Sequence, residues 1–369
     1  MSVFDVRRAR LRELLEGSGL QAVALMPGPS LFYLTGFRFH LMERPILGFF
    51  TVEGRAGLLA PELERPRVED RFPGALFFYG EDPHTWADTV HQALKALGLT
   101  RARVGVEPTR MRVLELRLLE TAAPRTTWED ASPVLARLRM RKDAGEIRAM
   151  ERAVAVAEAA LQALRPFLRP GVTEQDVAAE LYLQLIRHGS EPELPFPPIV
   201  AAGPNSANPH AMPTARALRP GDLVLIDWGA RVEGYVSDLT RMFVLGEPRP
   251  EWLRWARLVE EAQAAACAAA RPGVPAGAVD RAARRVFEEA GYAAYFIHRT
   301  GHGLGLEAHE PPYLFAENRQ LLEPGMTFTI EPGLYFPGQG GVRIEDDVVL
   351  TERGCRMLST LPRGLTVLP

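Results

Sequence analysis

Residues 222–245 read DLVLIDWGARVEGYVSDLTRMFVL and place two carboxylates in segments that otherwise have the apolar character of buried strands. Asp227 follows the run Leu-Val-Leu-Ile, and Asp238 precedes a second apolar run. An unpaired carboxylate that is removed from water costs several kcal/mol. We therefore expect something positively charged to compensate both acids.

The same stretch predicts a β-hairpin that turns near residues 232–234. Positions equally distant from a turn are opposed in an antiparallel pair, so the two acids are expected to face each other. A second hairpin is predicted around PGQGG, residues 337–341, and Glu331 and Glu345 are symmetric about Gly338 within this stretch. If the two hairpins pack about a pseudo-twofold axis, four carboxylates converge.

An internal repeat supports such an axis. The motif RPGV occurs at 169–172 and 271–274, and in both places a glutamate stands eleven residues before it. Helical patterns surround each copy, and RPGDLVLID, ending at Asp227, aligns with EPGMTFTIE, ending at Glu331. A single Arg-Pro-Gly match would only mark a common boundary between a helix and a loop. Several matches in the same order favour a duplication.

Two domains are predicted. Residues 1–134 alternate strand-like runs such as AVALM and ALFFYG with helical patterns, which indicates a small α/β domain. Asp143 followed by Glu146 is typical of a capping box at the start of a helix, and a long alanine-rich segment follows. We place the boundary before this helix, so that residues 135–369 form the second domain and the fold class is α+β.

Composition excludes several classes of function. A formal net charge of −3 gives no electrostatic footprint for nucleic acid or for a membrane surface. The two cysteines, Cys267 and Cys355, are too few for a disulfide framework and fit a reducing compartment. No run approaches the roughly 20 apolar residues of a membrane span. We predict a cytoplasmic protein without nucleic-acid or membrane partners.

Three histidines lie between the two predicted hairpins. They occur in HRTGHGLGLEAHE as His298, His302 and His309, around a glycine-rich loop. Carboxylates and imidazole together suit a pair of divalent ions such as Mn²⁺, Co²⁺ or Zn²⁺. Two such cations would offset about four negative charges. The sequence therefore predicts a dinuclear metal site that compensates the buried acids.

These residues resemble a known family, the metallopeptidases of the pita-bread fold, which includes Xaa-Pro dipeptidase (prolidase), Xaa-Pro aminopeptidase and methionine aminopeptidase. The resemblance covers about residues 140–352, and LFYLTGF at 31–37 resembles the smaller domain of the creatinase and prolidase branch. It implies a pita-bread catalytic domain with pseudo-twofold duplicated halves, preceded by a creatinase/prolidase-type N-terminal domain. The family's metal ligands match Asp227, Asp238, His302, Glu331 and Glu345 without substitution.

The resemblance also implies how these ligands act. Asp227 is expected to bind one ion, His302 and Glu331 the other, and Asp238 and Glu345 both. A hydroxide held between the two ions is then the nucleophile, because metal binding brings the pKa of water down to about 7.

Further roles follow from the same resemblance. Glu331 is expected to act also as general base and acid. His210 and His309 match histidines that stabilise the oxyanion. His298 and Phe196 match substrate contacts, although a core position is the simpler explanation for Phe196, and a structural role is the default for any single histidine.

Arg343 has two possible interpretations. It could be an ordinary surface residue, but strand alternation in VRIEDDVVL places it on the same face as Glu345 and Asp347. We therefore expect it to point toward the metals. There it would bind the carboxylate of a dipeptide, or hold a metal ligand such as Asp227.

The function predicted from these residues is a metal-dependent exopeptidase for Xaa-Pro bonds, a prolidase, with Xaa-Pro aminopeptidase as the alternative. Methionine aminopeptidase fits less well because of the N-terminal domain and His298. A non-catalytic pita-bread binding module fits less well because the ligand set is intact. By resemblance the protein is also expected to be a homodimer, in which residues 36–45 close the partner's site.

Overall fold

The computed structural model describes residues 2–369 and divides the chain into two compact units. The first unit ends at Arg139 and the second begins at Met140. The boundary expected from the sequence, between residues 134 and 135, lies inside helix α6 (Ser132–Arg139). The observed boundary between the two units lies at the end of that helix.

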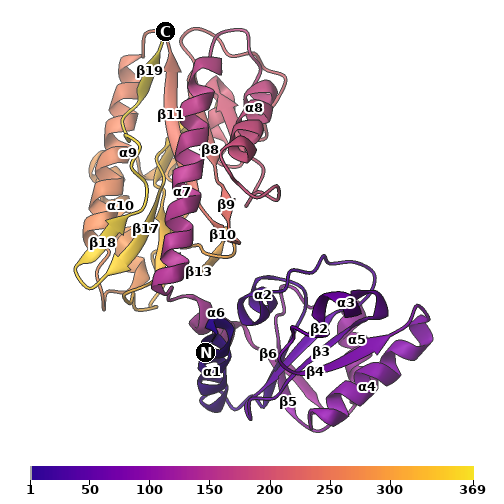
Figure 1. The fold of residues 1–369 in the computed structure, drawn as a ribbon. Coiled ribbons are helices and arrows are strands. Elements are labelled where there is room, and N and C mark those ends of the chain that lie inside the picture. Colours follow the sequence, from indigo (N-terminus) through magenta and orange to yellow (C-terminus); the bar gives the residue numbers. More distant parts are fainter. Residues whose placement is uncertain (1) are drawn as a thin grey trace. The chain divides into compact units, whose positions relative to one another are not determined.

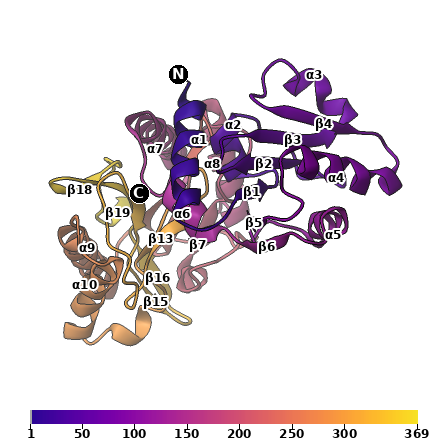
Figure 2. The same cartoon turned by 90° about the horizontal axis from the view of Figure 1, so that it is seen from below.

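The first unit is built on a six-stranded mixed sheet with strand order β4-β3-β2-β1-β5-β6. β1 is antiparallel to β2 and parallel to β5. Apolar side chains of α4 and α5 pack with β1 and β2 in one buried core. Figure 2 shows the ribbon of this sheet and its helices. In chain order its helices and strands are α1 (Val3–Glu16), β1 (Ala22–Leu25), α2 (Pro29–Thr35), β2 (Leu47–Thr51), β3 (Ala56–Pro61), α3 (Arg65–Val68), β4 (Ala75–Tyr79), α4 (Trp86–Ala96), β5 (Arg103–Val106), α5 (Val113–Ala122), β6 (Thr127–Asp130) and α6.

The second unit contains two larger sheets, ordered β19-β11-β8-β7 and β13-β12-β14-β17-β18, which four long helices flank (Figure 1). In chain order its elements are α7 (Ala144–Leu164), α8 (Glu174–Arg187), β7 (Ile199–Ala202), β8 (Leu223–Trp228), β9 (Arg231–Val232), β10 (Tyr235–Val236), β11 (Leu239–Leu245), α9 (Pro250–Ala269), α10 (Ala276–Glu289), β12 (Gly301–Gly303), β13 (Glu310–Leu314), β14 (Thr327–Ile330), β15 (Gly333–Phe336), β16 (Gly340–Arg343), β17 (Asp346–Thr351), β18 (Gly354–Met357) and β19 (Thr366–Leu368).

The predicted start of α7 is confirmed. Asp143 Oδ1 accepts hydrogen bonds from the backbone N–H groups of Gly145 and Glu146 at 2.6 and 2.9 Å. In return, the Asp143 N–H donates to Glu146 Oε2 at 2.9 Å. This capping box satisfies N–H groups that the first turn of a helix leaves without partners.

The two halves of this unit repeat one arrangement, as the sequence predicted. The pair α7 and α8 precedes β8, and the pair α9 and α10 precedes β14. Each second helix begins beside a matching isolated bridge, Thr173 with Ala217 and Pro275 with Leu321. The two sheets meet at an antiparallel bridge between Thr240 and Glu345. The unit is therefore a pita-bread domain made of two joined halves.

The register of the second predicted hairpin is confirmed. Gly333 pairs with Arg343, and Ile330 pairs with Asp346 on the other side of the two glutamates. Glu331 and Glu345 therefore lie opposite each other. They occupy the junction between the β14–β17 pair and the β15–β16 pair.

The register of the first hairpin was predicted wrongly. Asp227 lies opposite Thr240, and Asp238 is its diagonal neighbour two residues away. The cause is the turn, whose two central residues are Glu233 and Gly234, with φ angles of 52° and 85°. Positive φ at both positions is the mark of a two-residue hairpin turn that follows the twist of its strands. The centre of the turn therefore lies later in the chain than we expected.

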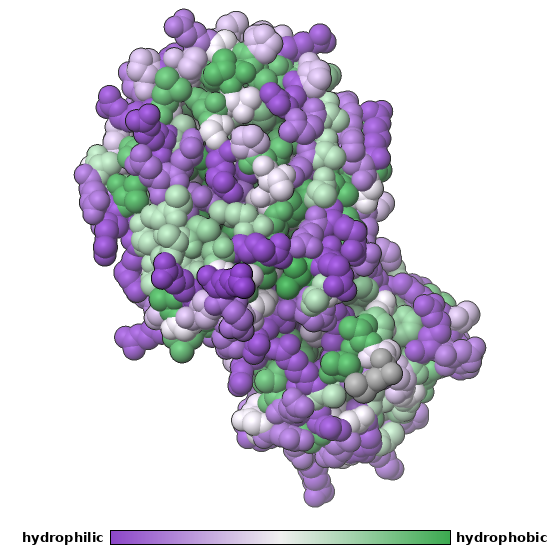
Figure 3. Space-filling view, turned by 60° about the vertical axis from the view of Figure 1, so that its left-hand side comes forward, coloured by the Kyte–Doolittle hydropathy of each residue, from purple (hydrophilic) through white to green (hydrophobic). Residues whose placement is uncertain are grey.

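The outside of the molecule mixes hydrophilic and hydrophobic side chains, and hydrophilic ones cover much of the face drawn in Figure 3. Within residues 2–369, none of the helices combines the length and the apolar character that crossing a membrane requires.

Candidate active site

A cleft of about 580 Å³ in the second unit brings the predicted site residues together. Its lining contains every residue that the sequence singled out for catalysis, for substrate contact or for metal binding. It also contains three that the sequence analysis missed, namely Ile199, Pro209 and Arg299. The predicted members are Phe196, His210, Asp227, Asp238, His298, His302, His309, Glu331, Arg343 and Glu345.

Asp227 lies near the end of β8 and is held by Arg343. Arg343 Nη2 is 2.5 Å from Asp227 Oδ2, and both side chains are buried. The other donors of this guanidinium bind Thr240 Oγ1 at 3.0 Å and the Tyr335 hydroxyl at 2.9 Å. The second oxygen of Asp227, Oδ1, is buried without a hydrogen-bond partner in the described part of the chain. An acceptor left in this way is what a cation ligand requires.

Asp238 is positioned through its backbone. Its N–H donates to Oδ2 of Asp347 at 3.0 Å, and Asp347 is itself fully buried. Gly229 lies directly after β8, where a Cβ atom would come within 2.0 Å of the Ser237 carbonyl oxygen. Only glycine allows the two chains to approach this closely here.

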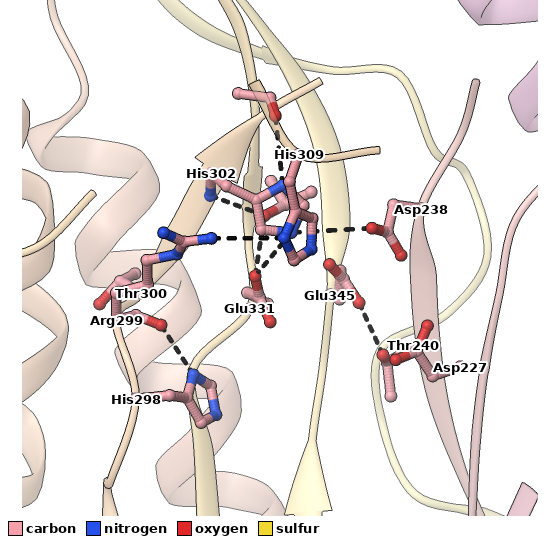
Figure 4. A network of polar contacts seen from close by, with 12 residues as sticks. Asp227, Asp238, Thr240, His298, Arg299, Thr300, His302, His309, Glu331 and Glu345 are labelled. Carbon is pink, nitrogen blue, oxygen red and sulfur yellow. Dashed lines mark hydrogen bonds and ion pairs between the residues drawn. The ribbon is translucent and has the colours of Figure 1, made fainter. Parts of the chain in front are cut away.

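His302 occupies the middle of β12 between two glycines. A Cβ atom at Gly301 would lie 2.0 Å from the Thr329 carbonyl oxygen, and one at Gly303 would lie 2.4 Å from the Pro311 carbonyl oxygen. The Gly-His-Gly sequence therefore lets the neighbouring strands close tightly around the histidine. Its Nε2 points at the acids, 3.1 Å from Glu331 Oε1 and 3.7 Å from Asp238 Oδ2 (Figure 4).

The two glutamates are each held by a threonine. Glu345 Oε2 accepts a hydrogen bond from Thr240 Oγ1 at 2.7 Å, which links the two halves through side chains beside their backbone bridge (Figure 4). Glu331 Oε1 accepts from Thr329 Oγ1 at 3.1 Å. Both carboxylates therefore keep a fixed orientation toward His302 and the two aspartates.

Three overlapping groups of side chains bring their ligand atoms within 4.8 Å of one another, the distance range needed to hold a metal ion. Two of them contain only residues that the sequence predicted as ligands. The third includes His309, for which we expected a carbonyl-stabilising role; its ring centroid is 3.8 Å from that of His302. The groups are Asp227, Asp238 and Glu345; His302, Glu331 and Glu345; and Asp238, His302 and His309.

The pKa values of three of the four acids show that their negative charges are poorly compensated within the protein. Burial raises the pKa of Asp238 and of Glu345 well above their ordinary values, and neighbouring carboxylates raise both further. Burial also raises the pKa of Asp227, although Arg343 opposes the rise. Burial acts in the same direction on Glu331, but the hydrogen bond and charge of His302 outweigh it and lower the pKa to about 2. Divalent cations would compensate the negative charges of Asp227, Asp238 and Glu345, which burial and mutual repulsion both disfavour.

The remaining histidines line the cleft at different depths. His298 is partly buried, with Nε2 2.9 Å from the Tyr335 hydroxyl and Nδ1 2.7 Å from the Arg299 carbonyl oxygen. His309 is exposed, and its Nδ1 is 3.5 Å from Arg299 Nη2. His210 is exposed on the loop that follows Gly203–Ala207. The two exposed imidazoles are thus able to reach a bound ligand.

Two buried acids that sequence reasoning missed hold the loops that carry these histidines. Glu174 accepts hydrogen bonds from the backbone N–H of Ala202 at 2.7 Å and from Thr214 N–H and Oγ1 at 2.9 and 2.6 Å. It therefore closes the loop that contains His210. Its signal in the sequence was hidden by the more obvious capping box of Thr173, directly before it.

Asp280 does the same for the loop before His302. It accepts from the N–H and Oγ1 of Thr300, both at 2.8 Å, and pairs with Arg284 at 2.6 Å. Arg284 in turn donates to the carbonyl oxygen of His298 at 2.6 Å. In the sequence this acid and arginine look like an ordinary solvated helix pair, because they are four residues apart.

Fold and site together define a cleft of the metallohydrolase type in a duplicated domain. Residues 148–352 match the metallopeptidase family M24, and residues 7–141 match the creatinase/prolidase N-terminal domain. The chain belongs to metallopeptidase family M24 and is a metallopeptidase. This membership implies divalent metal ions, and the buried oxygen and nitrogen donors of the cleft suit them.

Individual relatives extend over the whole chain. A probable dipeptidase, PepE of Mycobacterium bovis, is 38% identical, with 100% of this chain and 97% of the relative covered. The solved prolidase of Thermococcus sibiricus is 33% identical with a TM-score of 0.92, and each chain is covered completely. An X-Pro aminopeptidase structure from Thermotoga maritima is 30% identical with a TM-score of 0.86, with 98% and 99% covered.

Proposed function

We propose that this metallopeptidase hydrolyses Xaa-Pro dipeptides, the activity of a prolidase. The observation that carries the proposal is the group of four carboxylates, three buried and one partly buried, with one buried imidazole in a cleft. The full-length similarity to a prolidase and to a probable dipeptidase supports dipeptides as the substrate. Xaa-Pro aminopeptidase remains the alternative, because an aminopeptidase shares the fold.

We assign two divalent ions, Mn²⁺, Co²⁺ or Zn²⁺, to the predicted ligands. Asp227 would help to hold one ion and His302 and Glu331 the other, while Asp238 and Glu345 would contribute to both. Two ions held there would polarise the scissile carbonyl group and lower the pKa of the attacking water.

The chain's own residues then move the protons and stabilise charge. The Glu331 carboxylate takes a proton from water and passes it to the proline nitrogen as the bond breaks. Burial and the charge of His302 lower the pKa of His309 to about 4, so this ring is neutral at pH 7. Arginine can only donate, so the contact from Arg299 assigns the ring proton of His309 to Nε2, which then donates to the carbonyl oxygen. We assign the same role to His210, which also lines the cleft.

Apolar side chains give the cleft a surface for the proline ring. Phe196 and Ile199 lie along it with Pro209, and all three are part of its lining. An Xaa-Pro bond is a tertiary amide without an N–H group, so shape and apolar contact must replace the hydrogen bond that ordinary peptide bonds offer.

We assign different roles to the two arginines of the cleft, Arg343 and Arg299. The donors of Arg343 are occupied by Asp227, Thr240 and Tyr335, so we assign it to holding the metal ligand. The side-chain contacts of Arg299 within residues 2–369 are the Tyr313 ring, 4.4 Å away, and His309. Because neither is acidic, the Arg299 guanidinium is the better candidate to bind the substrate carboxylate.

The test uses metal-stripped enzyme that is resupplied separately with Mn²⁺, Co²⁺ or Zn²⁺. Each form is assayed on Ala-Pro and on Ala-Pro-Ala. We expect no activity without metal and a strong preference for Ala-Pro with it. Equal or better cleavage of the tripeptide would establish the aminopeptidase, and cleavage of neither would reject the proposal.

We also propose a cytoplasmic homodimer, in which residues 36–45 close the partner's cleft. This segment lies outside helices and strands, and it exposes Leu41 and Met42. The resemblance to prolidases motivates the proposal, and loops of this kind often carry specificity. Sedimentation at assay concentration is the test, since a fully active monomer would contradict it.

A further inference from the structure

A second cleft in the same unit, of about 540 Å³, contains both cysteines of the chain. Cys267 belongs to α9 and Cys355 to β18, and 88 positions separate them in the sequence. Their Sγ atoms are 2.7 Å apart, and both side chains are partly exposed. None of the residues that line this cleft belongs to the lining of the candidate active site.

The contacts around the two thiols hold α9 next to the β17–β18 hairpin. Gln263 lies one helical turn before Cys267, and its Nε2 donates to Asp346 Oδ2 at 2.8 Å. Cys355 pairs with Leu350 in the antiparallel β17–β18 hairpin. Figures 1 and 2 both draw α9 and this hairpin on the same side of the second unit. The bond from Gln263 therefore joins the helix to the hairpin one helical turn before Cys267.

The two thiols differ in their readiness to ionise. The hydrogen bond with Cys355 lowers the pKa of Cys267, burial opposes this effect, and the charge of Arg363 adds to it. The same hydrogen bond and burial raise the pKa of Cys355. Because the thiolate is the nucleophile in exchange with disulfides, Cys267 is the thiol that attacks first.

We propose that Cys267 and Cys355 form a dithiol site that reacts with small organic disulfides and becomes an intramolecular disulfide. The thiolate of Cys267 attacks one sulfur of the small disulfide, and the other half leaves as a thiol. Cys355 then loses its proton and attacks Sγ of Cys267, which releases the second thiol. The protein loses two protons and two electrons, and the small disulfide gains both to become two thiols.

The product would tie α9 to the hairpin that begins directly after Glu345. A cross-link between residues this far apart in sequence restricts the unfolded chain strongly. We therefore expect the oxidised protein to melt at a higher temperature than the reduced protein. This expectation does not depend on the peptidase activity or on the metal.

The experiment treats the purified full-length protein with oxidised glutathione, blocks free thiols with N-ethylmaleimide, and maps tryptic peptides by mass spectrometry. We expect one linked peptide pair that contains Cys267 and Cys355 and is two hydrogen atoms lighter than the reduced pair. Dithiothreitol should return both thiols to a form that N-ethylmaleimide blocks. Two blocked thiols after oxidation, or a stable glutathione adduct on the wild type, would overturn the proposal.

Single serine variants test the order of the steps. Cys355→Ser should stop at a glutathione adduct on Cys267, because the second attack is removed. Cys267→Ser should react more slowly, since it retains only the thiol with the raised pKa. Equal rates for the two variants would contradict the assigned order, and the mapping of the wild type remains decisive if either variant fails to fold.

Discussion

Arg343 Nη2 lies 2.5 Å from Asp227 Oδ2, and this ion pair is buried on both sides. The guanidinium also binds Thr240, whose hydroxyl donates to Glu345. One arginine therefore holds candidate metal ligands from both halves of the domain, directly for Asp227 and through Thr240 for Glu345.

Arg343→Met should lower kcat/KM for Ala-Pro by the equivalent of about 2–5 kcal/mol, because it leaves the charge of Asp227 buried without a partner. Metal content after dialysis should fall together with activity. If activity falls while the metal content stays complete and KM is the only kinetic constant that changes, Arg343 binds substrate instead.

Arg299→Met should raise KM for Ala-Pro while the metal content stays unchanged. The physical reason is that a dipeptide carries its free carboxylate directly after proline, and Arg299 is the cleft cation whose side-chain contacts are not acidic. Prolinamide substrates, which lack this charge, serve as the control and should respond little. A parallel rise in KM for the amide would count against carboxylate binding.

Asp238→Asn or Glu345→Gln should lose at least one metal ion and nearly all activity, since each acid is assigned to both ions. Metal analysis and kcat measure the two effects. Glu352→Gln provides a matched control, because Glu352 is an exposed acid just after β17. Full turnover by an Asp238→Asn protein that contains no metal would refute the two-ion mechanism.

Chelation should lower the melting temperature, and resupplied metal should restore it. A ligand that binds only the folded state at 100 times its Kd stabilises that state by about 2.7 kcal/mol. Removing the cations also restores repulsion between buried carboxylates. An unchanged melting temperature, after elemental analysis has confirmed metal loss, would contradict this.

Asp280→Asn should destabilise the fold by about 1–3 kcal/mol and raise KM for Ala-Pro, because Asp280 holds Thr300 and, through Arg284, the carbonyl group of His298. Urea unfolding and steady-state kinetics measure the two effects. Glu288→Gln, at an exposed position of the same helix, is the control. A variant with lower stability but wild-type KM would reduce Asp280 to a purely structural role.

How far the sequence predicts this molecule depends on which interactions are local. The capping box of Asp143 and the repeat of Pro-Gly turns are local patterns, so helix starts and the duplicated halves could be predicted. The hairpin at Asp227 could be predicted, but its register could not, because positive φ at Glu233 has no strong sequence signal. A shift of this kind keeps both aspartates on one face, which explains why the site survived the error.

The two acids that hold the histidine loops could not be predicted from the sequence, for a different reason. Glu174 and Asp280 act on backbone groups 28 and 20 positions further along the chain. No spacing rule connects a helical acid to a distant loop, so only the folded chain reveals which carboxylate is buried. The candidate ligands were easier to find, because charge in an apolar run is conspicuous in itself.

The bridge between Thr240 and Glu345 makes metal binding a property of two half-domains. One half supplies Asp227 and Asp238, and the other supplies His302 and Glu331 with Glu345. Neither fragment of a chain divided between β11 and α9 would contain all five candidate ligands. Metal uptake by mixed fragments would therefore report reassembly of the domain. Sequence changes in either half would be constrained by a metal site to which both halves contribute.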